Sequence, residues 1–323
     1  MRKNSNKNFK HKHSLGQNFI TDEFLLEDIA DESGINENDF VLEIGPGNGA
    51  LTRCLCARAK YVVTVEIDKS LIPLLRSNLK EYNNVSIINA DFLNLDFQEI
   101  LNSFSTAVGA KHCEPAPVGA NADCIGAKLC EPAPVGAKLC EPIKVVANLP
   151  YYITSPIIQN LLQNPHICDM TLMVQKEVAE RIVAIPGNRD YGVLTLACNY
   201  FADTEMIMIV SKDCFYPKPK VDSAVVHFKK HSIGANADIV GANTDFVGAK
   251  HCESQTFDKN YEKLFKLIKA SFSERRKKLI NSLINAGYNK DLLLSAFSKL
   301  NFDENIRAEN LSLDDYRKLL NEL

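Results

Sequence analysis

The stretch FVLEIGPGNG, residues 40–49, sets the architecture that we expect for this chain of 323 residues. An apolar, β-branched run leads directly into glycines at positions 45, 47 and 49. Such a run is typical of a buried strand, and glycine permits a tight turn in which the backbone approaches a ligand closely. We therefore predict a strand that ends in a ligand-binding glycine loop.

Similar apolar runs recur along the chain, and amphipathic stretches such as residues 70–80 (SLIPLLRSNLK) separate the first three of them. The next three runs are YVVTVEID (61–68), VSIINAD (85–91) and KVVANLPY (144–151). Strands that alternate with helices favour an α/β fold with a largely parallel sheet covered on both faces. Ligands of such sheets bind outside the carboxyl ends of the strands, so the residues at those ends are the candidates for a site.

Two acidic residues end the second and third runs, namely Glu66, 21 positions after Gly45, and Asp91. Glu66 can accept hydrogen bonds from ribose hydroxyls, and Asp91 is placed to accept one from an exocyclic amine. The glycine spacing, GxGxG, is one residue shorter than the dinucleotide fingerprint. The set predicts a Rossmann-like pocket for an adenosine without pyrophosphate, such as S-adenosylmethionine. Helix capping by each acid and a nicotinamide cofactor are the alternatives.

The sequence Asn148-Leu149-Pro150-Tyr151 ends the fourth run and suggests a reaction. The N6 amine of adenine is a poor nucleophile, because its lone pair is delocalised into the ring. The side-chain oxygen of Asn148 and the backbone oxygen of Leu149 can each accept a hydrogen bond from one of its two N–H groups. These hydrogen bonds draw the nitrogen toward a tetrahedral geometry. Pro150 fixes the backbone after that carbonyl, and Tyr151 offers a face for stacking. We therefore predict methyl transfer to an adenine; a plain strand end with a proline turn is the alternative.

Five motifs now appear in a fixed order: HKHSLGQNFI (11–20), LEIGPGNG (42–49), NLPY (148–151), VQKEVAERI (174–182) and FYPKPKVDSAV (215–225). This order resembles the ribosomal RNA adenine dimethyltransferases, which modify two adjacent adenosines near the 3′ end of small-subunit (16S) rRNA. The resemblance covers nearly the whole chain apart from two inserted segments. It implies a Rossmann-like S-adenosylmethionine-dependent methyltransferase sheet with a small C-terminal all-α domain.

The resemblance also implies a role for individual residues. The cofactor-binding residues would be Asn18 and Ile20, which close over it, Gly45 and Gly47 beneath its methionine part, Glu66 at the ribose, Asp91 at the adenine, and Asn148. The catalytic residues would be Asn148 between cofactor and target, Leu149, and Tyr151 and Phe215 on opposite faces of the target base. From the residues alone, Phe215 before two prolines is more typical of a core aromatic in an extended loop.

Two segments rich in glycine, alanine and proline interrupt this pattern. Complete or partial copies of the unit GAKHCEPAPVGA begin at Gly109, Gly126, Gly136 and Gly248. The unit has no helical or alternating apolar period, so it cannot build a core, and it resembles mobile palindromic repeats that insert in frame into bacterial genes. We interpret residues 109–142 and 234–253 as loop insertions, because lengthening a surface loop costs little free energy.

Five of the ten cysteines lie in these segments. Zinc sites use ligand pairs at short spacing, such as two residues between cysteines. The cysteines near His112 are instead 11, 6 and 10 positions apart, as the repeat length dictates, at Cys113, Cys124, Cys130 and Cys140. We therefore expect no metal, although a metal site is the alternative.

Basic residues are concentrated at the N-terminus and near the C-terminus. Five Lys or Arg and no acid precede Asp22, and residues 259–278 carry eight bases against two acids. Such patches favour a polyanion-binding surface, whereas a solvated tail and helix are the alternative. The residues expected to contact RNA phosphates are Lys10, Lys12, Arg275, Arg276, Lys277 and Lys278.

We expect a catalytic domain at residues 1–231, a linker insertion at 234–253 and a helical RNA-binding domain at 254–323. No apolar run approaches the roughly 18 residues that span a bilayer, and the N-terminus lacks a secretory apolar core, so we expect a cytoplasmic protein. We also expect it to be a monomer. The expected partner is 16S rRNA in the small subunit or its precursor. An adenine of large-subunit rRNA is an alternative target. A ribosome-assembly or RNA-binding factor whose methylation is incidental is an alternative function.

Overall fold

The computed structural model describes residues 18–109, 142–231, 259–274 and 276–323. Contacts divide the chain into two units, residues 1–149 with 215–217, and residues 150–214 with 218–323. Several predictions lie outside the described residues: those on the cysteines and His112 of the first insertion, on the second insertion, and on Lys10, Lys12 and Arg275.

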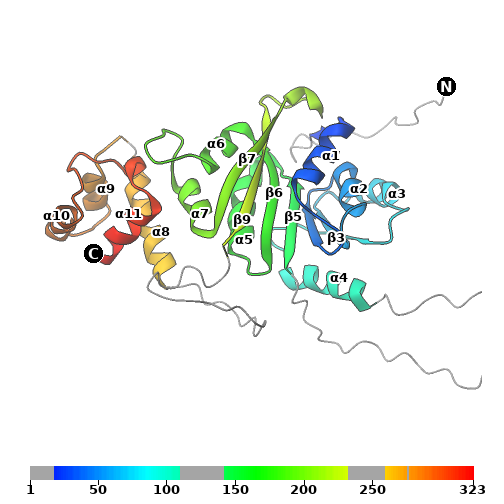
Figure 1. The fold of residues 1–323 in the computed structure, drawn as a ribbon, viewed down its shortest axis with the longest axis horizontal. Coiled ribbons are helices and arrows are strands. Elements are labelled where there is room, and N and C mark those ends of the chain that lie inside the picture. The colour runs from blue at the N-terminus through cyan, green and yellow to red at the C-terminus, as the bar shows by residue number, and fades with distance from the viewer. Residues whose placement is uncertain (1–17, 110–141, 232–258, 275) are drawn as a thin grey trace, which may run out of the picture. The chain divides into compact units, whose positions relative to one another are not determined.

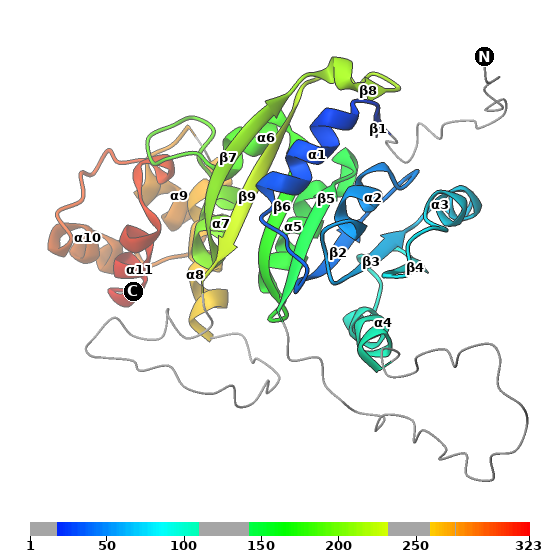
Figure 2. The same ribbon diagram turned by 45° about the vertical axis from the view of Figure 1, so that its right-hand side comes forward.

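The first unit contains a parallel sheet, as predicted. Its strands β2 (Phe40–Ile44), β3 (Tyr61–Glu66), β4 (Val85–Asn89) and β5 (Ile143–Asn148) lie in the order β4-β3-β2-β5 (Figure 2). Every residue of β2 is buried, as its largely apolar pattern indicates, and this includes Glu43. Although the first insertion precedes β5, this strand pairs with β2 in register, with Leu42 opposite Val145.

Helices follow the strands of this unit: α1 (Glu23–Glu32), α2 (Ala50–Cys56), α3 (Ile72–Asn78) and α4 (Phe97–Gly109). Asp22 caps α1 by accepting from the backbone N–H groups of Phe24 and Leu25. The ring of Phe104 on α4 is fully buried and meets the ring of Phe40 edge to face, with centroids 5.2 Å apart. This aromatic contact anchors α4 on the sheet.

Two short strands of the first unit, β1 (Phe19–Ile20) and β8 (Phe215–Tyr216), pair antiparallel. Phe19 lies opposite Tyr216, and Ile20 lies opposite Phe215. The pairing therefore brings together the first and the last of the five sequence motifs. Figure 2 shows β1 and β8 next to each other in the upper part of the view.

The strands of the second unit pair antiparallel, a feature that the sequence patterns did not specify. Strands β6 (Ile167–Gln175), β9 (Ser223–Lys230) and β7 (Ala202–Val210) lie in the order β6-β9-β7. A bulge between Met206 and Met208 shifts the register of β7 against β9. The helices that accompany these strands are α5 (Thr154–Gln163), α6 (Lys176–Ile182) and α7 (Val193–Phe201).

The C-terminal region is helical, as predicted, and belongs to the second unit. It contains α8 (Lys259–Ser271), α9 (Leu279–Asn285), α10 (Lys290–Lys299) and α11 (Leu313–Asn321), drawn in yellow to red beside α7 in Figure 1. Short 3₁₀ turns of this unit are η3 (Tyr151–Ile153), η4 (Lys212–Cys214), η5 (Phe272–Glu274) and η6 (Ala308–Asn310).

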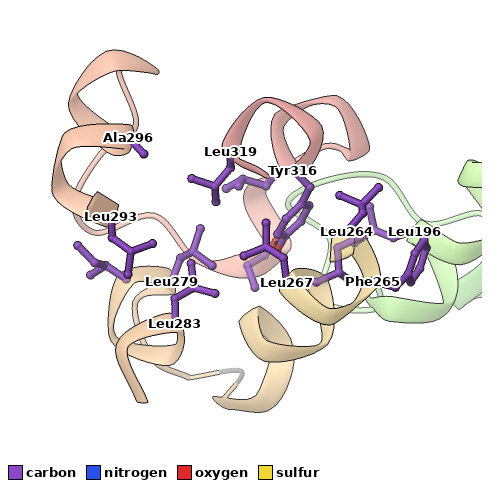
Figure 3. Close-up of a cluster of buried hydrophobic side chains, with 14 of the residues drawn as sticks. Leu196, Leu264, Phe265, Leu267, Leu279, Leu283, Leu293, Ala296, Tyr316 and Leu319 are labelled. Carbon is purple, nitrogen blue, oxygen red and sulfur yellow. The ribbon is translucent and has the colours of Figure 1, made fainter. Parts of the chain in front are cut away.

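One apolar cluster holds the C-terminal helices together and includes residues of α7. Figure 3 shows Leu196 of α7 beside Leu264 and Phe265 of α8, and Tyr316 of α11 among the leucines. The buried Tyr316 hydroxyl donates to the backbone oxygen of Ala308 at 3.1 Å. This cluster joins α7, which belongs to the expected catalytic domain, to the C-terminal helices. The division of the chain into a catalytic domain and an RNA-binding domain therefore stays a prediction about function.

Only part of the basic stretch at residues 259–278 lies on a helix: Lys259, Lys263, Lys266 and Lys269 are on α8, whereas Arg276, Lys277 and Lys278 lie in the connection that follows it. Helix α8 ends at Ser271, and α9 begins only at Leu279. Glu274 accepts hydrogen bonds from Lys277 and from the Asn285 side chain, which closes the connection between the helices. Within the residues that the structure describes, no helix is both long and apolar enough to span a membrane.

Candidate active site

The glycine loop after β2 forms a turn that only glycine adopts readily. Gly45, Gly47 and Gly49 have φ angles of 70°, 60° and 82°, in the left-handed region. A Cβ atom on Gly47 would lie 2.6 Å from Cε1 of Phe19, so strand β1 packs directly on the loop. The predicted close approach of backbone is therefore present at this strand end.

Glu66 connects the glycine loop to the end of β3. Its Oε2 accepts from the backbone N–H of Gly47 at 3.1 Å, and its Oε1 accepts from that of Asp68 at 2.8 Å. The residue is 4% exposed. Burial raises the pKa of its carboxyl above the ordinary value, and the two backbone N–H groups counteract part of that rise. The acid and the loop thus meet, as their positions at neighbouring strand ends predict.

Asp91 lies at the same edge of the sheet, two residues beyond Asn89, which is the register partner of Glu66. Its Oδ1 accepts from the backbone N–H of Leu93 at 3.1 Å, and its Oδ2 accepts from the Asn94 side chain at 2.7 Å. Asp91 therefore closes a turn through its side chain, much as in the alternative in which this acid only caps a helix. Each carboxylate oxygen can accept more than one hydrogen bond, so this arrangement leaves capacity for a ligand.

Asn148 stands at the carboxyl end of β5. Its amide nitrogen donates to the backbone oxygen of Asn18 at 3.3 Å. Because the nitrogen is directed to Asn18, the amide oxygen is the end that remains for another donor. One open cavity includes both residues together with Ile20, Gly45 and Gly47, so it gathers five of the predicted site residues.

The remaining predicted residues are Leu149 and Phe215 in the first unit and Tyr151 in the second. Leu149 has a buried side chain, 1% exposed, which fixes the position of its backbone. Phe215 is 4% exposed and lies opposite Ile20 in the β1–β8 pair. In the second unit, the hydroxyl of Tyr151 is 2.7 Å from that of Ser223, and burial raises the pKa of this tyrosine.

A further acid, Glu43 of β2, lines the same cavity and was given no role from the sequence. It is 2% exposed, and its Oε2 has no hydrogen-bond partner among the residues that the structure describes. Burial raises the pKa of its carboxyl to about 8. An acid inside an otherwise apolar strand, FVLEI, is the signal that points to it.

The chemistry of the cavity fits a positively charged nucleoside cofactor. The glycine loop offers close backbone contact, and Glu43 offers a buried oxygen without a partner among the described residues. Glu66 does not line the cavity itself but accepts from the loop at Gly47. A buried carboxylate oxygen without a hydrogen-bond partner is suited to a cation, because an opposite charge offsets the cost of removing a carboxylate from water. These residues therefore fit S-adenosylmethionine, whose methionine part carries positive charge.

Solved structures of the same fold define the class. The chain is similar to the crystal structure of a dimethyladenosine transferase from Plasmodium falciparum, with a TM-score of 0.64 and 24% identity, covering 94% of this chain and 96% of that one. It is also similar to the crystal structure of the 23S rRNA methyltransferase ErmE, with a TM-score of 0.59, 24% identity, and coverage of 94% and 99%. The chain thus shares the Rossmann-like fold of these two structures, as predicted.

The sequence comparisons narrow this class to one family. Residues 8–239 match the family described as "Ribosomal RNA adenine dimethylase". A protein of Clostridium botulinum called "Ribosomal RNA small subunit methyltransferase A" is 38% identical over 312 residues, which is 96% of this chain and 93% of the relative. The protein of the same name from Clostridioides difficile is 35% identical over 317 residues, 97% and 91% of the two chains. The chain belongs to the ribosomal RNA adenine dimethylase family, which confirms the resemblance seen in its motifs.

Proposed function

We propose that this enzyme dimethylates N6 of two adjacent adenosines near the 3′ end of 16S rRNA, with S-adenosylmethionine as methyl donor, during small-subunit biogenesis. The observation that carries the proposal is the orientation of Asn148, whose amide nitrogen binds Asn18 and whose oxygen is left for an incoming amine. Relatives named for the small subunit support the choice of 16S rRNA. We further propose that the enzyme acts as a cytoplasmic monomer.

The residues at the strand ends would hold the cofactor. Those proposed to contact it are Asn18, Ile20, Gly45, Gly47, Glu66, Asp91 and Asn148. When bound, S-adenosylmethionine supplies a methyl group activated by its sulfonium charge. Glu66 would accept from the ribose hydroxyls while its backbone partners keep the carboxylate in place, and Asp91 would accept from the adenine amine.

Two oxygens at the end of β5 would position the target amine. The Asn148 amide oxygen and the Leu149 backbone oxygen would each accept a hydrogen bond from one N–H group of the amine. The nitrogen lone pair is then less delocalised into the ring and is directed toward the methyl group. Holding the amine in line supplies much of the rate, and no strong general base is needed. The target adenosine must swing out of its stack to reach this point, and Tyr151 and Phe215 are the aromatic residues proposed to stack on it.

The direct test is mass analysis of the 3′ end of 16S rRNA from cells with and without this protein. We expect two adjacent dimethyladenosines with the protein and two unmodified adenosines without it. Parallel reactions on isolated 30S particles and on large-subunit RNA separate the two target hypotheses. Modification of large-subunit RNA alone would contradict the proposal.

A second experiment separates catalysis from an assembly role. A variant that cannot bind the cofactor is returned to cells that lack the protein. Failure to restore growth favours catalysis, whereas full restoration favours an assembly factor whose methylation is incidental.

The exposed residues Arg276, Lys277 and Lys278 are proposed to contact RNA phosphates. Lys277 is paired with Glu274 at 2.7 Å, an exposed ion pair that costs little to exchange for a phosphate. Replacing all three by glutamine is expected to weaken RNA binding at low salt. The slope of log affinity against log salt should become shallower by about 2, since each phosphate contact contributes roughly 0.7–0.9.

The measurement is RNA affinity between low and moderate salt for the wild type and the triple variant. A matched control removes the same charge elsewhere in the C-terminal region, at the exposed residues Lys290, Lys299 and Lys318. Equal slopes for both triple variants would show that net charge, and not the connection between α8 and α9, governs RNA binding.

A further inference from the structure

Three buried polar side-chain atoms surround the start of the glycine loop without ordinary hydrogen bonds. They are Oε2 of Glu43 and the hydroxyls of Thr52 and Thr64, all of which lack a partner within the described part of the chain. Thr64 lies opposite Glu43 in the register of β2 and β3, and Thr52 is on α2. A buried, unpartnered carboxylate costs several kcal/mol, so a group at this place favours its neutral form.

Burial is the largest cause of the raised pKa of Glu43, and its polar neighbours act in opposite directions. The hydroxyl of Thr52 on α2 lowers this pKa, and the carboxylate of Glu66 on β3 raises it by a smaller amount. Cys56 of α2 is the other titratable group nearby, and burial and the negative charge of Glu43 raise the pKa of its thiol. No cation among the described residues affects the pKa of Glu43, which lies at about 8.

We propose that Glu43 is protonated in the cofactor-free enzyme and releases its proton when the positively charged methionine part of S-adenosylmethionine enters the cavity. The O–H bond of the carboxyl breaks, the proton passes to the solvent buffer, and the carboxylate remains beside the cation. The inference rests on the proposed function and adds to it a positioning residue that recognises ligand charge. Its basis is the place of Glu43 in the cavity of Asn18, Gly45 and Asn148.

The expected proton count follows from the two states of the carboxyl. If its pKa falls from about 8 to the ordinary value on binding, about 0.9 proton is released per ligand at pH 7 and about 0.1 at pH 9. The amino group of the ligand is already mostly protonated at pH 7, so its own titration changes the count by only about 0.1–0.2 proton. The difference between the two proteins therefore isolates Glu43.

The test is isothermal titration calorimetry of the full chain in buffers of different ionisation enthalpy. Wild type, Glu43→Gln and the exposed-acid control Glu37→Gln are each titrated with S-adenosylmethionine, S-adenosylhomocysteine and the neutral 5′-methylthioadenosine. At pH 7, wild type and Glu37→Gln should release about 0.9 proton more than Glu43→Gln with S-adenosylmethionine. Methylthioadenosine should show no such difference.

Each outcome has a defined meaning. A difference with S-adenosylmethionine alone assigns the effect to the sulfonium, and a difference with both amino-acid ligands assigns it to the ammonium; both support the inference. Equal proton counts in wild type and Glu43→Gln, with normal ligand binding, overturn it and leave the proposed function intact. Absence of ligand binding by the wild type overturns the proposed function as well.

A second measurement does not depend on the variant folding. The infrared difference spectrum of the wild type, with and without S-adenosylmethionine at pH 7, should show loss of a protonated carboxyl band. At pH 9 the loss should be about tenfold smaller, because the carboxyl is already ionised. A spectrum without that loss at pH 7 overturns the inference.

Discussion

Asn148→Ala is expected to lower the rate of methyl transfer by about 10²- to 10³-fold while the protein stays folded. The variant keeps the backbone oxygen of Leu149 but loses the side-chain oxygen that accepts the second N–H bond of the amine. The lone pair then stays delocalised for more of the approach to the methyl group. The lost hydrogen bond to Asn18 is expected to cost only about 1 kcal/mol of stability.

The measurement is single-turnover methylation of 30S particles, together with calorimetric binding of S-adenosylhomocysteine. Asn84→Ala is the matched control, because the Asn84 amide donates to the backbone oxygens of Cys56 and Ala59 and does not line the cavity. This control should lose stability and keep its rate. If Asn148→Ala methylates at the wild-type rate, the two-oxygen mechanism is wrong, whatever its effect on cofactor binding.

The parts of the site that the sequence could predict are those that follow from strand order alone. Largely apolar, β-branched runs such as Phe40–Ile44 favour a strand buried on both faces. Once the strands are parallel, their carboxyl ends share an edge, so Glu66 and the glycine loop must be neighbours. The hydrogen bond from Gly47 to Glu66 is the direct consequence.

Other features depend on contacts between segments far apart in the chain. The pairing of Ile20 with Phe215 involves strands of two residues, too short to show a period. The pattern of α8 shows which face is apolar but not that it packs against Leu196. For a similar reason, no role could be assigned to Glu43 from the sequence. The lack of a hydrogen-bond partner for its Oε2 among the described residues depends on how the interior packs, which the sequence pattern does not show.

Glu66→Ala is expected to weaken binding of S-adenosylhomocysteine by about 10²- to 10⁴-fold. The carboxylate is proposed to accept two ribose hydroxyls, and hydrogen bonds to a charged group are worth about 1.5–3 kcal/mol each. The substitution also removes the acceptor of the Gly47 and Asp68 backbone N–H groups. The free energy of unfolding should fall as well, by roughly 1–3 kcal/mol for each donor that stays buried and unpaired.

Titration calorimetry and chemical denaturation of the same variant separate these two effects. Glu27→Ala is a suitable control, because it removes the exposed ion pair with Arg58 in the same unit without touching the loop. Glu66→Gln adds a sharper test: its amide retains one acceptor but places an N–H₂ group against one of the backbone donors. It should therefore bind the ligand less tightly than the wild type although its shape is unchanged. If Glu66→Ala binds S-adenosylhomocysteine as tightly as the wild type, Glu66 holds the loop and does not contact the ribose.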